Sequence, residues 1–246
     1  MQTELPNIVT LAAERFRGAA WTGHLPLLEN VFFSLVIVLV LSIIAYAASR
    51  SRALVPASRL QNAVELIVEG VDDFICGVLG RNGRRFLPFI GTLFIYILCM
   101  NLSGLIPLMK SSTTSWSTTL ALAICVFTYV QYAAVKELGL LGYIDHLLGR
   151  PRGIIAFSVF IPVLMLFMHI ITELIRPISL SLRLRSNIWG DDTLLAVLSS
   201  FGIKGVPLLV FSSFIVIVAA VVQAVVFCLL TTIYFSLVLT HEEKIE

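Results

Sequence analysis

The chain has 246 residues, of which 58% are hydrophobic and only 13% are charged, and its formal net charge at pH 7 is +2. Soluble domains carry about 25% charged residues, so this composition predicts an integral membrane protein. The sequence contains no phosphate-binding loop, no dinucleotide-binding fingerprint and no basic nucleic-acid patch. We therefore expect it to bind neither nucleotide nor nucleic acid.

The N-terminal part of the chain predicts one membrane span and one surface helix. Residues 1–27 hold no short apolar region ending in a cleavage site, so we expect no removable signal peptide. A first membrane helix is predicted over residues 28–49, because residues 31–48 carry no charge and are close to the length of about 20 residues that spans a bilayer. Apolar residues then recur at helical spacing while acidic residues share another face, which predicts an interfacial amphipathic helix over residues 57–84. Packing of this helix on a soluble partner is the alternative.

Two ordinary spans and two unusually long ones follow. The ordinary spans are predicted over residues 86–109 and 118–137, and the long ones over residues 153–189 and 205–240. At about 1.5 Å per residue the last helix would be about 54 Å long, against a hydrocarbon core of about 30 Å. We therefore predict that the two long helices are strongly tilted and antiparallel, joined as a hairpin by residues 190–206. The predicted fold class is an all-α integral membrane protein with five membrane helices plus one interfacial helix.

The distribution of basic residues predicts the orientation of the chain. Arginine and lysine gather between spans one and two and between spans three and four, whereas the loop between spans two and three holds only Lys110. The positive-inside rule then places the N-terminus outside and residues 241–246 in a cytoplasmic tail.

The cysteines and histidines do not form a metal site in the sequence. The four cysteines contain no CxxC pair, and we expect them to be small buried apolar residues. His169 and Glu173 are four residues apart, but no third ligand lies nearby. We therefore expect no metal and no cofactor.

The fourth span carries a polar stripe. At 100° per residue its members fall within an arc of about 80°; they are His169, Glu173, Arg176, Arg183 and Asn187. A charged group at membrane depth costs at least about 2.5 kcal/mol and usually marks an ion path. For Glu173 and Arg176 the alternative is a structural ion pair at i,i+3.

Arg183 and Arg185 point to nearly opposite sides of the predicted helix. Arg183 cannot lose its proton, and the small serines beside it indicate close approach of another helix, which favours a functional charge. Arg185 would be too costly to bury unpaired. We expect it to face the first helices or an aqueous vestibule, with Asp191 or Asp192 as the nearest candidate acids.

Three segments resemble subunit a of the F-type ATP synthase membrane sector: residues 178–187, residues 223–234, and the turn over residues 101–107. The resemblance implies that the chain is not itself catalytic. It implies two offset half-channels that couple H⁺ or Na⁺ flow to rotation of a ring of c subunits, against which the tilted hairpin would lie. It also implies a b-subunit peripheral stalk and, indirectly, soluble F1 subunits as partners, in the lipid of a bacterial inner membrane.

The resemblance assigns roles residue by residue. Arg183 matches the essential arginine that faces the ring carboxylates, and Asn187 and Gln223 match its polar neighbours. Asp192 matches an acidic residue of the outer half-channel and Glu173 one on the inner side. The other expected members of the ion path are His169, Arg176, Asn101 and Tyr234.

The chain departs from the family pattern at three positions. Arg185 is an extra charge with no family role that we can assign. Val216 stands where some relatives carry histidine or glutamate, and His169 where many carry a second glutamate. The choice between H⁺ and Na⁺ stays open, because the coordinating site lies mainly on the ring subunit.

Two other classes of protein are alternatives. A secondary transporter or ion channel with its own midplane site would usually show internal repeats and broken helices, and the two halves of this chain do not match. A membrane scaffold without an ion path would leave the polar stripe unexplained.

Overall fold

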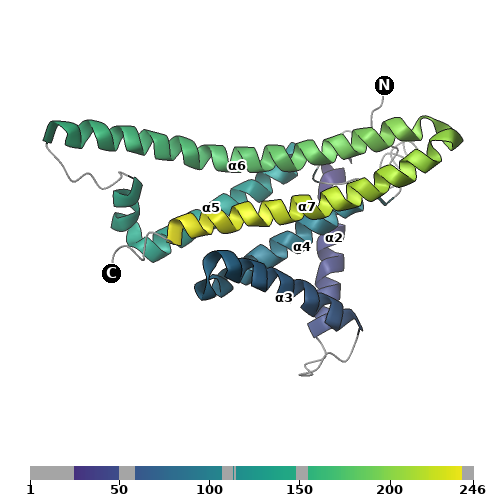
Figure 1. Cartoon of the computed structure of the whole chain (residues 1–246), viewed down its shortest axis with the longest axis horizontal. Coiled ribbons are helices and arrows are strands. Elements are labelled where there is room, and N and C mark those ends of the chain that lie inside the picture. The colour runs from purple at the N-terminus through teal and green to yellow at the C-terminus, as the bar shows by residue number, and fades with distance from the viewer. Residues whose placement is uncertain (1–24, 50–58, 107–112, 114, 148–154, 240–246) are drawn as a thin grey trace.

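The computed structural model describes residues 25–49, 59–106, 113, 115–147 and 155–239, and these contain helices but no strand. The helices are α2 (Leu25–Ser49), α3 (Arg59–Leu79), η1 (Arg81–Phe86), α4 (Leu87–Ser103), α5 (Trp116–Leu147), α6 (Ile155–Ser199), η3 (Gly202–Gly205) and α7 (Val206–Leu239) (Figure 1). Five of them are long and apolar enough to cross a membrane. The predicted class, an all-α integral membrane protein, is confirmed.

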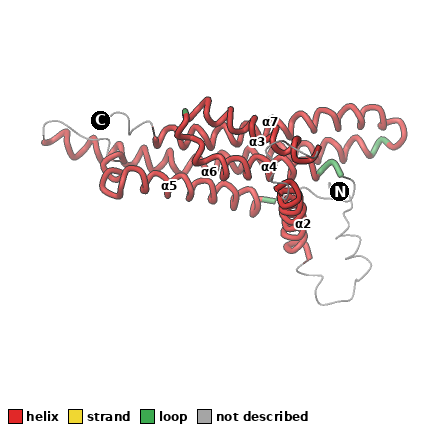
Figure 2. The backbone as a smooth tube through the Cα atoms, turned by 90° about the horizontal axis from the view of Figure 1, so that it is seen from below, coloured by secondary structure: helices red, strands yellow, loops and turns green. Residues whose placement is uncertain are grey.

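The two longest helices, α6 and α7, run side by side in opposite directions (Figure 1), and the same pair lies along the long axis of the molecule when it is seen from below (Figure 2). Their 45 and 34 residues correspond to about 68 and 51 Å of helix. α2 lies at a large angle to both in the two views. A bilayer crossed upright by α2 would therefore hold α6 and α7 at a shallow angle, which is the tilt that their lengths require.

The end of α6 differs from the sequence prediction. The helix was expected to end at residue 189, with a connection over residues 190–206, but it continues to Ser199. Asp191 and Asp192 do not break it, because apolar residues continue at helical spacing beyond them. The chain turns at Gly202, whose φ of 62° favours glycine, and Gly205 then packs so closely that a Cβ there would lie 2.7 Å from the carbonyl oxygen of Leu198.

α5 is also longer than predicted, and it is broken. Residues 118–137 were expected as a span, whereas the helix begins at Trp116 and runs to a kink at Gly139, with φ 69° and ψ 162°. A second helical stretch then continues to Leu147. Glycine adopts this left-handed φ without steric cost, so the chain can change direction there.

An aromatic cluster joins α4, α5 and α7 in the core. The rings of Phe86 and Phe235 are stacked with centroids 4.4 Å apart, and those of Phe89 and Tyr129 are stacked at 4.2 Å. Phe86 and Phe235 are almost fully buried. Helix association in lipid depends on such packing, because lipid tails supply no hydrophobic driving force between helices.

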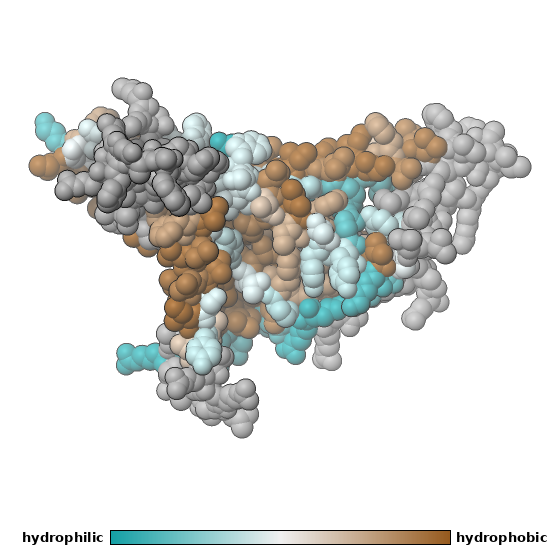
Figure 3. Space-filling view, turned by 180° about the vertical axis from the view of Figure 1, so that it is seen from behind, coloured by the Kyte–Doolittle hydropathy of each residue, from teal (hydrophilic) through white to brown (hydrophobic). Residues whose placement is uncertain are grey.

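Two ion pairs attach the surface helix α3 and η1 to the bundle. Arg84 donates from Nε and Nη2 to Asp72 Oδ2 at 3.0 and 2.7 Å, and Arg85 pairs with Glu137 of α5. The hydrogen bonds from Arg84 hold the pKa of Asp72 below its ordinary value. Apolar surface covers α2 and α6 in Figure 3, while polar residues gather along the lower edge, on the side of α3. This arrangement fits a helix lying at the membrane surface.

The expectation of buried cysteines was wrong for three of the four. Cys228 is buried and its thiol donates to the carbonyl oxygen of Ile90 at 3.7 Å, but Cys76 and Cys99 are half-buried and Cys125 is exposed. The side chain of Cys125 needs no protein neighbour, because an apolar group on the outer face of a membrane helix meets lipid.

The aromatic cluster should dominate the stability of the helix bundle. We expect Phe235→Ala to lower the free energy of unfolding by about 3 kcal/mol through the cavity it leaves, measured as a lower thermal midpoint of the purified protein in detergent. Phe214→Ala is the matched control, because Phe214 lies on the same helix with 64% of its surface exposed. Equal midpoints for the two variants would contradict the packing described above.

Candidate functional site

α6 buries one face and presents another. Leu180, Leu184 and Ile188 recur every four residues and are almost fully buried in the core. Because residues four apart share a helix face, Arg183 is carried to a different side, where its side chain is exposed. It lies on a hollow of about 390 Å³ whose other lining residues are Ile175, Ile178, Ser179, Leu182 and Ser186.

The charge of Arg183 is not neutralised within the described part of the chain. Its side chain makes no hydrogen bond and no ion pair with any described residue. The surrounding surface of α6 and α7 is apolar, with exposed side chains such as Ile178, Leu182 and Val222. A guanidinium in such a setting needs an anion from outside the chain or water.

Asn187 and Gln223 join α6 to α7 next to Arg183. The Asn187 Nδ2 atom donates to Gln223 Oε1 at 2.5 Å. Gln223 is 4% exposed, whereas Asn187 lies at the surface. The two residues that the family resemblance implies as polar neighbours of the arginine are therefore in contact with each other, and one of them is buried between the two helices.

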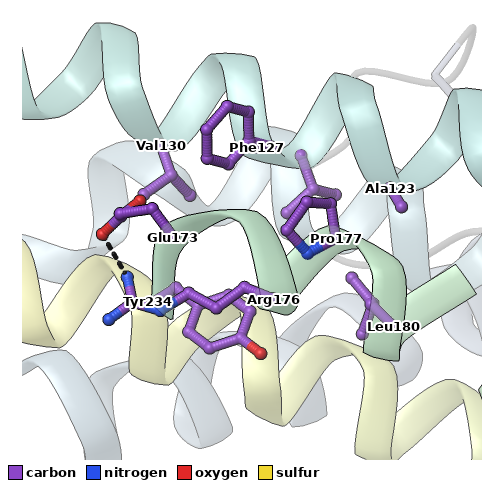
Figure 4. Close-up of a pocket in the computed structure, with 9 residues that line it drawn as sticks. Ala123, Phe127, Val130, Glu173, Arg176, Pro177, Leu180 and Tyr234 are labelled. Carbon is purple, nitrogen blue, oxygen red and sulfur yellow. Dashed lines mark hydrogen bonds and ion pairs between the residues drawn. The ribbon is translucent and has the colours of Figure 1, made fainter. Parts of the chain in front are cut away.

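Glu173 and Arg176 form the i,i+3 ion pair that was the alternative interpretation of their spacing. Arg176 Nη1 donates to Glu173 Oε1 at 2.8 Å, and the guanidinium carbon lies 5.1 Å from the centroid of the Tyr234 ring (Figure 4). A cation over an aromatic face is stabilised by the ring electrons. Three of the predicted site residues, from α6 and α7, are thus brought together.

Gln131 and Tyr143 belong to the same cluster but were missed by the sequence analysis. Gln131 of α5 donates from Nε2 to Glu173 Oε2, and the Tyr143 hydroxyl donates to Gln131 Oε1 at 2.5 Å. Burial and the negative charge of Glu173 raise the pKa of the Tyr143 hydroxyl, so it stays protonated and can donate. A lone glutamine within a predicted span was the available signal, since polar side chains are costly there.

Arg185 packs on an aromatic ring rather than on an acid. Its guanidinium carbon lies 4.8 Å from the ring centroid of Trp116, at the start of α5. The predicted direction, away from the Arg183 face, agrees with this contact, but neither Asp191 nor Asp192 forms a recorded ion pair with Arg185 in the described residues. Trp116 was not among the partners expected from the sequence.

Asn101 and Asp192, two further predicted members of the ion path, lie in the different helices α4 and α6. Asn101 of α4 is 3% exposed; its Oδ1 accepts from the Thr113 hydroxyl at 3.4 Å, while its Nδ2 has no partner among the described residues. Asp192 is half-buried inside α6. The expectation that it lies where the hairpin turns was wrong, because α6 continues past it to Ser199.

His169 of α6 and Val216 of α7 are the two positions at which the chain departs from relatives that carry an ionisable residue there. His169 Nδ1 lies 3.1 Å from the carbonyl oxygen of Met165 on its own helix. The described residues contain no group of three or more His, Cys, Asp or Glu side chains that could hold a metal ion. Val216 is 5% exposed, so it packs inside the protein and does not contribute a polar group.

The polar groups are therefore distributed along α6 on both sides of Arg183. Glu173 lies ten residues before Arg183, about 15 Å along the helix, and Asp192 lies nine residues after it, about 13 Å. Each set includes side chains from neighbouring helices. These ionisable and polar groups form a row along α6, in which Arg183 has no hydrogen-bond or ion-pair partner among the described residues.

Comparison with known proteins matches residues 31–236 to the family model of the ATP synthase A chain. The chain is 36% identical over 249 residues to ATP synthase subunit a of Protochlamydia amoebophila, covering 98% of this chain and 90% of the relative. It is 33% identical over 215 residues to ATP synthase subunit a of Oleidesulfovibrio alaskensis, covering 87% of each. It is 36% identical over 213 residues to that of Solidesulfovibrio magneticus, covering 87% of this chain and 85% of the relative.

The contact between Asn187 and Gln223 can be tested by cross-linking. In a background whose native cysteines are replaced by alanine, Asn187→Cys with Gln223→Cys should be joined efficiently by a short bifunctional thiol reagent, as measured by mass spectrometry of the digested protein. Asn187→Cys with Val222→Cys is the control, because Val222 is next in sequence but 53% exposed on another face of α7. Equal yields from both pairs would contradict the helix register.

Proposed function

The chain belongs to the ATP synthase A chain family and is the membrane-embedded subunit a of an F-type ATP synthase, and we propose that Arg183 is the charge at which ion flow is coupled to rotation. In this proposal the chain supplies two offset half-channels beside a ring of c subunits. Ions enter through one half-channel, neutralise a ring carboxylate, and leave through the other after nearly a full turn of the ring.

The unpaired charge of Arg183 carries the proposal. Its guanidinium is exposed on an apolar face of α6 and makes no ion pair with the described chain. A ring carboxylate is the anion that would complete this site, since an ionised carboxylate is too costly to expose to lipid. The hollow beside Arg183, flanked by Ser179 and Ser186, leaves room for such a group.

The cluster around Glu173 forms the inner half-channel in this account. Glu173, Arg176 and Tyr234 are hydrogen-bonded or stacked in one group, and His169 lies one turn earlier on the same helix. Polar side chains in a membrane are retained where they contact water or one another. A path from the cytoplasmic side would reach Arg183 along this face of α6.

The outer half-channel runs through Asp192, Asn187, Gln223 and Asn101. The unpartnered Nδ2 of buried Asn101 supports this assignment, because a buried donor without a protein partner is usually satisfied by water. Val216 adds no polar group, so the path relies on amides and on Asp192.

Arg183 keeps the two paths apart by electrostatics. It stabilises the ionised ring carboxylate and repels a cation that would pass directly from one half-channel to the other. Each unit charge that crosses contributes about 2.3 kcal/mol per 100 mV, so several must cross for each ATP made. The asymmetry between entry and exit is what turns ion flow into rotation in one direction.

The partners follow from the same proposal. The c ring contacts the exposed face of α6 and α7, the b-subunit peripheral stalk holds the chain still, and the soluble F1 subunits are reached only indirectly. The multi-pass fold sits in the inner membrane of a bacterium, with its N-terminus outside and its C-terminus in the cytoplasm. Three arginines on η1, next to the surface helix α3, support that orientation.

Arg183 is tested directly by substitution. Arg183→Ala should reduce ATP synthesis driven by an ion gradient to background while the complex still assembles, and Arg183→Lys should also fail largely, because lysine lacks the fixed planar charge and can lose its proton when desolvated. Arg185→Phe is the control and should retain most activity. ATP synthesis near the parent rate in Arg183→Ala vesicles would overturn the assignment.

Asp192 should control access from outside. Asp192→Asn removes the charge but keeps the size of the side chain, so ion-driven turnover should fall several-fold while ATP hydrolysis by detached F1 stays unchanged. Asp191→Asn, one position away on α6, shows whether the neighbour holds the role instead. Parent-like turnover in the Asp192 variant at every outer pH would count against the outer path.

A further inference from the structure

A continuous hydrogen-bonded chain runs from α5 to the ion pair on α6. Tyr143 donates to Gln131 at 2.5 Å, Gln131 donates to one carboxylate oxygen of Glu173, and Arg176 donates to the other oxygen at 2.8 Å. Both oxygens of Glu173 therefore accept a hydrogen bond, one of them from a cation. A hydrogen bond from a cation is shorter and stronger than one between neutral groups, so this arrangement fixes the position of the carboxylate.

The direction of the chain follows from the charge of Glu173. An ionised carboxylate can only accept, so the Gln131 amide must turn its N–H toward Glu173. Its oxygen is then left facing Tyr143, which must donate. The orientation of the amide and the donor role of the phenol are thus both set by the negative charge at the end of the chain.

The kink at Gly139 makes this contact possible. Gln131 and Tyr143 are 12 residues apart, which would separate them by about 18 Å along an unbroken helix. The left-handed φ of 69° at Gly139 turns the end of α5 so that the hydroxyl meets the amide. A Cβ at this position would meet nothing within 4 Å, so the glycine serves the backbone conformation rather than packing.

We propose that Gln131 and Tyr143 are positioning residues of the inner half-channel, which act through Glu173 by holding its carboxylate fixed against Arg176. The proposal rests on the proposed function of the cluster. Its consequence is that Glu173 serves as a fixed negative charge beside the path: it attracts cations from the cytoplasmic side and keeps Arg176 over Tyr234. The segment that follows Gly139 is then part of the transport machinery and not only a connection.

The other charged and titratable groups around Glu173 do not donate to its Oε2 atom among the described residues. Arg176 shares its helix and binds the opposite oxygen, His169 lies one turn away on α6, and Tyr234 faces Arg176 from α7. Among the described residues, Gln131 donates the hydrogen bond to Glu173 Oε2. Removing its amide leaves that oxygen without a protein donor.

Chemical modification can measure whether the Glu173 carboxylate is held by its partners. A hydrophobic carbodiimide modifies free carboxyl groups in preference to those held in ion pairs and hydrogen bonds, and mass spectrometry of the purified, intact ATP synthase measures the modified fraction of the Glu173 peptide. Gln131→Leu should raise the initial rate of this modification about tenfold, which is the factor expected from losing one hydrogen bond to a charged group. Tyr143→Phe should raise it by a smaller factor, since it removes only the hydrogen bond that orients the amide.

Tyr132→Phe is the matched control, because Tyr132 is 60% exposed on the same helix. Modification of the ring carboxylate in the same sample is the internal reference, and only complexes that retain the ring are assayed. If Gln131→Leu does not assemble, Tyr143→Phe alone decides the question.

Raised modification of Glu173 with an unchanged ring reference supports the proposal. Parent-like modification of Glu173 in the assembled variants overturns it and leaves the role of Arg183 untouched. Failure of the proposed function would be seen in a different experiment, in which Arg183→Ala vesicles still synthesise ATP.

Discussion

The guanidinium of Arg183 keeps its positive charge at any physiological pH, and no described side chain of its own chain pairs with it. It projects from an apolar face of α6, where an isolated charge costs at least about 2.5 kcal/mol. That cost is relieved only by an anion that comes from another subunit or by water. The contacts of α6 with the other helices hold this charge on the outer face of the helix, where a group from outside the chain can reach it.

The support has two parts. Leu180, Leu184 and Ile188 anchor α6 in the core, so that the face bearing Arg183 cannot rotate inward. Polar contacts then tie α6 to its neighbours on both sides of the arginine: Glu173 to Gln131 of α5, and Asn187 to Gln223 of α7. The extra arginine, Arg185, adds a third contact by packing on Trp116.

The sequence was sufficient to predict the all-α membrane class and the five long apolar helices, because hydropathy and helical periodicity are local properties. It missed Gln131, Tyr143 and Trp116 because each meets its partner across a contact between distant segments; Gln131 and Glu173 are 42 residues apart. The predicted end of α6 was wrong because Gly190, Asp191 and Asp192 are residues typical of a helix end. The apolar residues that follow them continue at helical spacing, so the helix does not end there. The kink at Gly139 depends on a positive φ, and a single glycine in the sequence is not sufficient to predict that conformation.

A structure of the intact ATP synthase at side-chain resolution would show which group neutralises Arg183. We expect its guanidinium to lie within about 4 Å of a c-ring carboxylate, or to be joined to it by one water. Arg185 should then remain on Trp116, away from the ring. A ring carboxylate opposite Arg185, with Arg183 turned toward lipid or paired within its own chain, would contradict the account and the helix register behind it.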